Sequence, residues 1–261
     1  MKVFLILGRF FLEFIEEIGG VSLLLWRVIQ QGHRIFRNIR NTFVQMETIG
    51  IGSIPLVLVT SVFVGAVTSV QAAYQFQGYV PLRYLGAVVG KSVTLEVGPV
   101  LTALVVGGRV SAAIAAELGT MKVTEQLDAM NIMAIDPARY LAMPRFLAAV
   151  LMMPIITILC DAIAVFGGYV ASVLTLDVTS STFIEGLKMF YKSSDLLGGL
   201  IKTFIFGGII AMSGIFFGFN TEGGAEGVGK STMTAVVGSC LSVLVADYVL
   251  AIILFQIVFG N

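Results

Sequence analysis

Charged residues are scarce in this sequence. Only 12% of the 261 residues are Asp, Glu, Lys or Arg, whereas 57% are hydrophobic. A typical soluble domain is about 25% charged, so the composition excludes a soluble domain and predicts a membrane protein. The 16 basic residues balance the 16 acidic residues. The net charge therefore gives no indication of a nucleic acid partner, and we expect none.

Cysteine and histidine are almost absent. Cys160 and Cys240 lie in apolar stretches, and His33 is the one histidine. A disulfide framework needs more cysteines in a small secreted chain, and one imidazole with two separated thiols is too few ligands for a zinc site. No nucleophile and base are grouped as an enzyme would need. We therefore expect reduced thiols, no metal site and no catalytic residues.

Long uncharged runs dominate the sequence instead. Residues 48–82 contain no charge, and 51–73 can cross a hydrocarbon core about 30 Å thick at about 1.5 Å per residue. Four more runs of this kind follow, at about 97–117, 145–173, 197–219 and 232–258. The predicted fold class is an all-α integral membrane protein with five transmembrane helices in residues 48–261.

The first 47 residues are amphipathic rather than uniformly apolar. One apolar stripe consists of Leu25, Ile29, Gly32, Phe36, Ile39 and Phe43, with Arg27, Arg34 and Arg37 across from it. A basic amphipathic helix of this kind suits the membrane surface. We predict an interfacial amphipathic helical segment over 1–47, and a helix packed on a protein core is the open alternative.

The distribution of lysine and arginine predicts the orientation. With the N-terminus in the cytoplasm, that side holds the basic residues of 1–47 and of 122–145, whereas Arg83, Lys91, Lys188, Lys192 and Lys202 lie on the other side. Cytoplasmic loops carry the excess of lysine and arginine. The N-terminus is therefore predicted to be cytoplasmic, and five spans place the C-terminus on the opposite side.

The most polar internal stretch, residues 118–144, lies between the second and third predicted spans. Val123, Leu127 and Met130 mark one apolar stripe, which predicts a short amphipathic helix at about 120–130 on the cytoplasmic surface. Asp136-Pro137 predicts an N-cap followed by proline at the first helical position. The composition leaves open whether this helix binds a cytoplasmic partner or rests on lipid headgroups.

Several charges fall inside the predicted spans, where a charge costs about 2.5–3.5 kcal/mol on insertion scales. They are Glu96, Arg109 and Glu117 in span two, Asp161 in span three and Asp247 in span five. We expect Glu96 and Glu117 near opposite interfaces, and Asp161 or Asp247 as the acid that neutralises Arg109. An alternative function follows, namely a secondary transporter or channel in which Arg109, Asp161 and Asp247 relay charge.

Residues 224–232, GAEGVGKST, fit the phosphate-binding pattern G-x-x-x-x-G-K-[ST]. A working P-loop lies between a buried strand and a helix, and the apolar, glycine-rich flanks here cannot build a sheet. We interpret the match as a false positive in a turn between two spans, with Ser231 and Thr232 capping the next helix. The preceding Gly214 and Gly218 have the spacing of closely packed membrane helices.

Residues 95–146 resemble the signature region of MlaE-type permeases, the membrane subunits of bacterial ABC lipid transporters that work with MCE proteins. The family pattern includes E-x-G-P-V, G-R, A-E-L-G-x-M, T-E-Q-L, D-P and P-R. In this chain these motifs begin at Glu96, Gly108, Ala116, Thr124, Asp136 and Pro144.

The resemblance implies a homodimeric, multi-pass permease of the bacterial inner membrane. A cytoplasmic ABC ATPase would bind ATP and Mg and contact the helix at about 120–130, so this chain would hold no cofactor. Phospholipid would move between the inner membrane and a periplasmic MCE hexamer, which maintains outer-membrane lipid asymmetry. A STAS-domain protein is a further implied partner.

The predicted functional residues fall into three groups. The residues predicted to couple to the ATPase are Thr120, Lys122, Val123, Glu125, Gln126, Leu127 and Met130. The predicted intramembrane charge and gating residues are Glu96, Gly98, Pro99, Arg109, Glu117, Asp161 and Asp247. The residues predicted to line a lipid cavity are Leu56, Val59, Phe63, Val67, Leu101, Leu104, Val243 and Val249.

Overall fold

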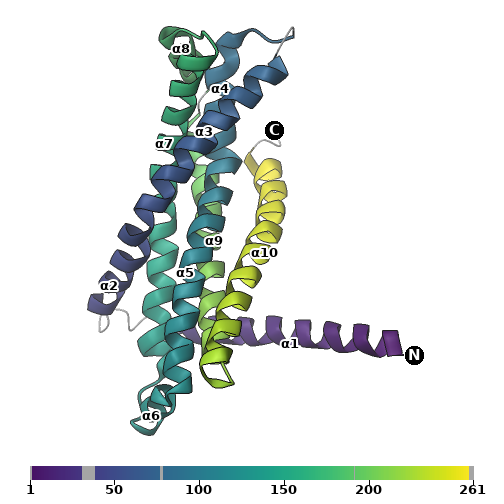
Figure 1. Cartoon of the computed structure of the whole chain (residues 1–261), viewed down its shortest axis with the longest axis vertical. Coiled ribbons are helices and arrows are strands. Elements are labelled where there is room, and N and C mark those ends of the chain that lie inside the picture. Colours follow the sequence, from purple (N-terminus) through teal and green to yellow (C-terminus); the bar gives the residue numbers. More distant parts are fainter. Residues whose placement is uncertain (1, 31–38, 77–78, 191, 259–261) are drawn as a thin grey trace.

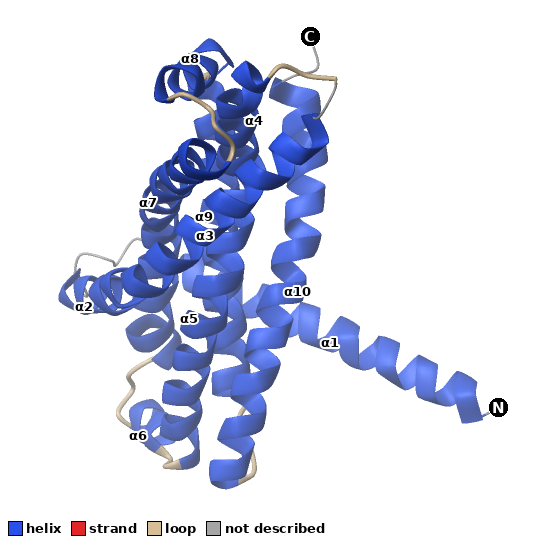
Figure 2. Ribbon diagram, turned by 45° about the horizontal axis from the view of Figure 1, so that its top comes forward, coloured by secondary structure: helices blue, strands red, loops and turns tan. Residues whose placement is uncertain are grey.

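The computed structural model describes residues 2–30, 39–76, 79–190 and 192–258. Within these ranges every regular element is a helix (Figure 2). Five helical segments are long and apolar enough to cross a membrane, at Ile39–Phe76, Leu82–Val123, Ala138–Thr175, Ser194–Phe219 and Gly224–Leu254. The predicted fold class and its five spans are confirmed. Each span is longer than its apolar run because the flanking polar turns are helical too.

Most of the spans are built from more than one helical element. The first contains α2 (Ile39–Gly50), the 3-10 turn η2 (Ile51–Ser53) and α3 (Ile54–Phe76), and the second contains η3 (Leu82–Tyr84), α4 (Leu85–Ser92), the π-helical turn η4 (Val93–Val97) and α5 (Gly98–Val123). The third joins the π-helical turn η5 (Ala138–Ala142) to α7 (Met143–Thr175), and α9 (Ser193–Phe219) and α10 (Gly224–Val258) complete the set. Outside the spans lie α1 (Lys2–Gln30), α6 (Gln126–Ile132) and α8 (Ser180–Phe190).

The spans run alternately up and down one bundle (Figure 1). The helix α6 and the α9–α10 connection lie at one end, and α8 lies at the other. We call these the α6 end and the α8 end. The helices α1 and α2 belong to the half of the bundle toward the α6 end, whereas α10 ends near the α8 end. The chain therefore has its N-terminal helices and α6 toward one end, as the five-span topology predicts.

The first helix, α1, runs away from the bundle across its long axis (Figure 2). Only its C-terminal half approaches the spans, where Gly20 lies against the Phe216 ring of α9 and Val28 is buried. Trp26 and Ile29 are exposed. Its placement at a membrane surface remains a prediction. Four residues of the predicted stripes, Gly32, Phe36, Arg34 and Arg37, lie outside the described residues.

Glycine allows the spans to approach at backbone distance. Gly65 of α3 lies directly against the Ala164 carbonyl of α7, and two side-chain hydrogen bonds join the same helices, from Ser61 Oγ to Cys160 Sγ (3.0 Å) and between the Ser69 and Ser172 hydroxyls (2.6 Å). Gly214 and Gly218 of α9 contact α5 in the same way, which confirms the close approach predicted from their spacing.

Replacing Gly65 with alanine should destabilise the fold. A Cβ at this position would meet the Ala164 carbonyl oxygen, which is backbone and cannot yield unless α3 and α7 separate. We expect a loss of about 1–3 kcal/mol or more in the free energy of unfolding. Gly108→Ala is the matched control, because a Cβ there meets nothing within 4 Å. Unfolding of both variants in micelles measures the difference, and equal stabilities would contradict this packing.

The glycine-rich stretch before the last span forms a shorter turn than predicted. Gly223 and Gly224 have φ values of 88° and 69°, which only glycine adopts without strain, and α10 begins at Gly224. Ser231 and Thr232 therefore lie inside α10, and the prediction that they cap it is wrong. The Thr232 hydroxyl donates within the helix, to the Val228 carbonyl (2.7 Å).

Candidate functional site: the α6 hairpin and the charged residues of the spans

The segment between spans two and three forms a helical hairpin, which we call the α6 hairpin (residues 118–144). The predicted short helix between these spans exists as α6, but its expected bounds of about 120–130 are wrong, because α5 extends to Val123 and α6 starts only at Gln126. The break is at Glu125, whose φ of 60° is left-handed and rare for a residue with a side chain. The Glu125 amide closes the turn on the Lys122 carbonyl (3.1 Å).

This break divides the predicted coupling residues between two helices. Thr120, Lys122 and Val123 belong to α5, and Gln126, Leu127 and Met130 belong to α6. Of these six only Leu127 is buried, while Val123 is exposed. The apolar stripe read through Val123, Leu127 and Met130 is therefore not continuous. A salt bridge from Lys122 to Asp128 (3.3 Å) joins the two helices across the break.

The far end of the hairpin carries exposed apolar side chains. Ile132 is 87% exposed and Met133 is 62% exposed, and Ile135 beside them is also exposed. We call these three residues the α6 tip. Ala134, with a φ of 57°, turns the chain back between them. The predicted restart is confirmed, because the Asp136 carboxylate accepts a hydrogen bond from the Ala138 amide (2.9 Å). Contiguous exposed apolar side chains indicate a surface that contacts a partner or a membrane.

An ion pair closes the base of the hairpin. Glu117 near the end of α5 accepts from Arg145 at the start of α7 (2.7 Å). The Arg145 side chain is buried, whereas that of Glu117 is 55% exposed. Glu117 therefore lies toward the α6 end of span two. Glu96 belongs to η4, which precedes α5 within the same span, and the expected position of both acids near opposite interfaces stays a prediction.

Three charged residues meet between the second, fourth and fifth spans. Lys202 of α9 donates to Glu96 of η4 (2.7 Å) and to Asp247 of α10 (3.0 Å). Only 3% of the Lys202 side chain is exposed, but Glu96 is half exposed. We call this group the Lys202 triad. One lysine thus contacts two acidic side chains, and the group is reachable from outside the chain through Glu96.

The sequence prediction missed Lys202 as an intramembrane residue. It was counted among the basic residues of one membrane side, although position 202 falls inside the predicted span 197–219. Two acids in other spans had no cation assigned to them. A lysine inside an apolar run was the signal that could have identified their partner.

Arg109 has neutral partners instead of the predicted acid. Its guanidinium donates to the Ser53 hydroxyl (2.8 Å) and to the Thr48 carbonyl (3.3 Å). Both acceptors lie where α2 gives way to α3, and Gly52 between them leaves room for the guanidinium. Arg109 therefore fixes the junction of α2 and α3, and the expectation that Asp161 or Asp247 neutralises it does not match these contacts.

Asp161 is buried in α7, and within the described residues neither carboxylate oxygen has a hydrogen-bond donor. It lies against Gly98, where any side chain would collide with it. The π-helical turn η4 ends at this point and Pro99 follows, so the helix of span two is irregular here. Arg109, Asp161 and Asp247 thus have three separate sets of neighbours.

The residues predicted to line a lipid cavity differ in exposure. Leu56, Val59, Phe63 and Val67 are all exposed on α3, and Val249 is exposed on α10. Leu101 and Leu104 are half-buried, whereas Val243 is fully buried in the hydrophobic core.

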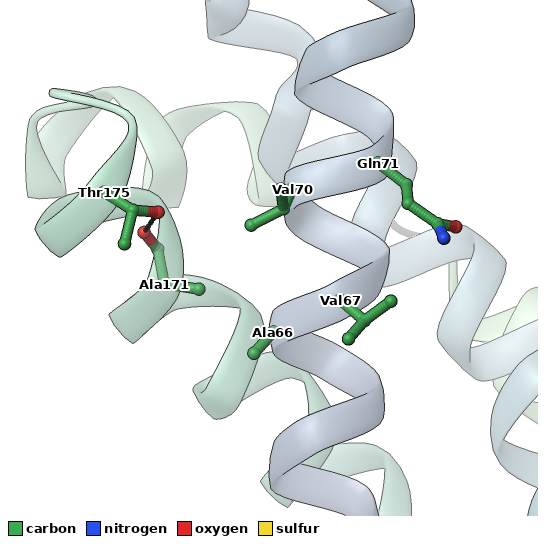
Figure 3. Close-up of a pocket in the computed structure, with 6 residues that line it drawn as sticks. All are labelled: Ala66, Val67, Val70, Gln71, Ala171 and Thr175. Carbon is green, nitrogen blue, oxygen red and sulfur yellow. Dashed lines mark hydrogen bonds between the residues drawn. The ribbon is translucent and has the colours of Figure 1, made fainter.

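Val67 also borders a groove of about 460 Å³ between α3 and α7. Figure 3 shows Ala66 and Val70 of α3 on one side of this groove, with Ala171 and Thr175 of α7 on the other. The Thr175 hydroxyl donates to the Ala171 carbonyl (2.6 Å), so its polar atom is already satisfied. Apart from Gln71 the groove therefore offers almost only apolar contacts.

The fold and these contacts define a multi-pass α-helical membrane protein whose spans pair buried charges and whose second and third spans are joined by a hairpin. Residues 42–253 match the family model described as Permease MlaE. The chain belongs to this family and is an ABC transporter permease of the MlaE type.

Relatives agree with this assignment. The chain is similar to a probable ABC transporter permease protein of Synechocystis, with 42% identity over 84% of this chain and 83% of the relative. A probable ABC transporter permease protein of Rickettsia prowazekii is 35% identical over 98% and 99% of the two chains. The intermembrane phospholipid transport system permease protein MlaE of Haemophilus influenzae is 32% identical over 95% and 96%.

Proposed function

We propose that this chain is the membrane subunit of an ATP-driven transporter that moves phospholipid between the bacterial inner membrane and a periplasmic MCE protein, and so maintains outer-membrane lipid asymmetry. Membership of the MlaE permease family supports the proposal, as does the name of the Haemophilus relative, which specifies intermembrane phospholipid transport. The working unit is a homodimer, joined by a cytoplasmic ABC ATPase, an MCE hexamer and a STAS-domain protein.

The observation that carries the proposal is the α6 tip. Its three side chains are exposed, and the hairpin that carries them lies at the end of the bundle (Figure 1), where a soluble partner can reach it. We place this end in the cytoplasm together with the N-terminus, following the excess of lysine and arginine there. The ATPase then binds the α6 tip, and the MCE protein binds the α8 end.

Energy comes from the ATPase subunit, which binds ATP and Mg. Two observations support a permease without an ATPase site of its own. The relatives are named as permeases, and residues 224–232 are the first turns of α10, whereas a P-loop needs a loop between a strand and a helix. The alternative of a charge relay is weaker, because its three residues contact different neighbours.

Photo-crosslinking tests where the ATPase binds. A photoreactive amino acid at Ile132, 87% exposed at the α6 tip, should crosslink an ATP-binding subunit in intact membranes. The same amino acid at Tyr79, 91% exposed in the connection toward the α8 end, is the matched control and should not. Crosslinking of the ATPase from position 79 and not from 132 would overturn the proposed sidedness. Crosslinking from neither position would remove the α6 tip as the binding surface.

A further inference from the structure

The Glu117–Arg145 ion pair lies at the one place where the two arms of the α6 hairpin leave the membrane-spanning helices. Arg145 Nη2 is 2.7 Å from Glu117 Oε1. Glu117 lies on α5 immediately before the α6 hairpin, and Arg145 lies on α7 immediately after it. The pair therefore joins α5 directly to α7, independently of the connecting chain.

Arg145 is held from two sides. Its Nη1 donates to the Leu141 carbonyl in the π-helical turn η5 (2.9 Å), while Nη2 binds Glu117. Its Nε is buried and has no partner within the described part of the chain. If Arg145 left Glu117, a buried guanidinium would lose the one counter-charge that the described residues give it, which is unfavourable in a low-dielectric environment.

Both arms beyond this pair are hydrogen-bonded. On the outgoing arm, α5 continues unbroken to Val123, and the Thr124 and Glu125 amides donate to the carbonyls of Thr120 (3.0 Å) and Lys122 (3.1 Å). On the returning arm, Ile135 donates to the Met130 carbonyl (2.9 Å), and the Tyr140 amide donates to the Asp136 carbonyl (3.0 Å). A force on α6 therefore reaches the base of the hairpin without being absorbed by a loose loop.

We propose that Glu117 and Arg145 are positioning residues that hold α5 and α7 together, so that a displacement of α6 moves both spans as one unit. Without the pair, the same displacement opens the base of the hairpin and α5 moves separately from α7. This inference rests on the proposed function, in which an ATPase displaces α6. It assigns the two charged residues a role in transmitting the displacement of α6 to the spans, in addition to stabilising the fold.

Charge removal in the assembled transporter gives the first test. Glu117→Gln keeps the size of the side chain and removes its charge. We expect the number of lipids moved per ATP hydrolysed to fall by about tenfold, within the usual range of coupling between distant sites. Asp128→Asn is the matched control, because it removes an exposed ion pair from the same hairpin, and it should change the ratio by less than about twofold. If Glu117→Gln moved as many lipids per ATP hydrolysed as the native transporter, the proposal would be overturned.

The second test replaces the ion pair with a covalent bridge. It keeps the proposal testable if Glu117→Gln fails to assemble. Glu117→Cys and Arg145→Cys are combined with Cys160→Ala and Cys240→Ala, and a short bis-maleimide bridges the two new thiols in membranes before extraction. The bridged transporter should recover the native ratio of lipid to ATP, whereas the unbridged protein should not. A merely structural pair would leave the ratio unchanged in the unbridged protein. Loss of transfer on bridging would mean that the pair must open, which contradicts the proposal.

The native complex separates the two hypotheses. If the native complex moves no lipid on ATP addition, the proposed function fails and the role of the pair is refuted with it. If the native complex is active but the variants keep its lipid-to-ATP ratio, only the inference about Glu117 and Arg145 fails.

Discussion

Replacing Lys202 with methionine should unfold much of the bundle at temperatures where the native chain is stable. The methionine fills a similar volume but leaves Glu96 and Asp247 without the cation that holds both of them. Removing one partner of a buried ion pair costs about 3–5 kcal/mol, because the remaining charge is uncompensated. Since Glu96 is half exposed, we expect a loss at the lower end of this range. Thermal unfolding of the purified chain in detergent measures this loss.

The rescue variant distinguishes lost charge from lost packing. Lys202→Met combined with Glu96→Gln and Asp247→Asn removes all three charges and keeps the side-chain sizes. Buried ion pairs can be replaced by neutral groups at little cost, so this triple variant should regain most of the native stability. If Lys202→Met alone melts like the native chain, the triad does not hold α9 to α10 and η4.

Reversing the charge of Glu125 should abolish most lipid movement while the homodimer still assembles. Glu125 is exposed at the break between α5 and α6, so Glu125→Lys changes the surface offered to the ATPase without entering the core. We expect lipid transfer per ATP to fall by about tenfold or more, as for other couplings between distant sites. Proteoliposomes containing the complete transporter allow lipid transfer and ATP hydrolysis to be measured together.

Two controls separate the charge of Glu125 from its backbone. Glu125→Gln keeps the side-chain size, and Glu125→Gly favours the left-handed φ of 60° that the native residue adopts. Both should retain more coupling than Glu125→Lys. Native transfer per ATP in Glu125→Lys would remove Glu125 from the coupling surface, and equal losses in all three variants would assign the effect to the side chain rather than its charge.

The spans could be predicted because the membrane imposes a length and a composition on each of them. The close approach at Gly214 and Gly218 could also be predicted, since only small residues permit it. The helix break at Glu125 could not, because left-handed backbone there is fixed by the hairpin and leaves no mark in residue type. The apolar periodicity alone therefore predicts one helix from Thr120 to Met130, although the chain breaks it at Glu125.

Charge partners were the least predictable part of the site. The sequence shows which spans contain Arg109, Asp161 and Asp247, but their neighbours depend on how the helices rotate and pack. Arg109 donates to neutral acceptors at the junction of α2 and α3, and Asp247 accepts from Lys202. Opposite charge in two spans is thus a poor guide to pairing when polar backbone at a helix junction is within reach.

The most direct test of the whole account compares the purified chain with the assembled transporter in the same proteoliposomes. The chain alone should neither hydrolyse ATP nor move phospholipid when ATP is added. Addition of the ATPase subunit and the MCE protein should produce both activities together. ATP hydrolysis by the chain alone, or lipid movement that does not require the ATPase, would contradict the conclusion that this permease is driven by a separate subunit.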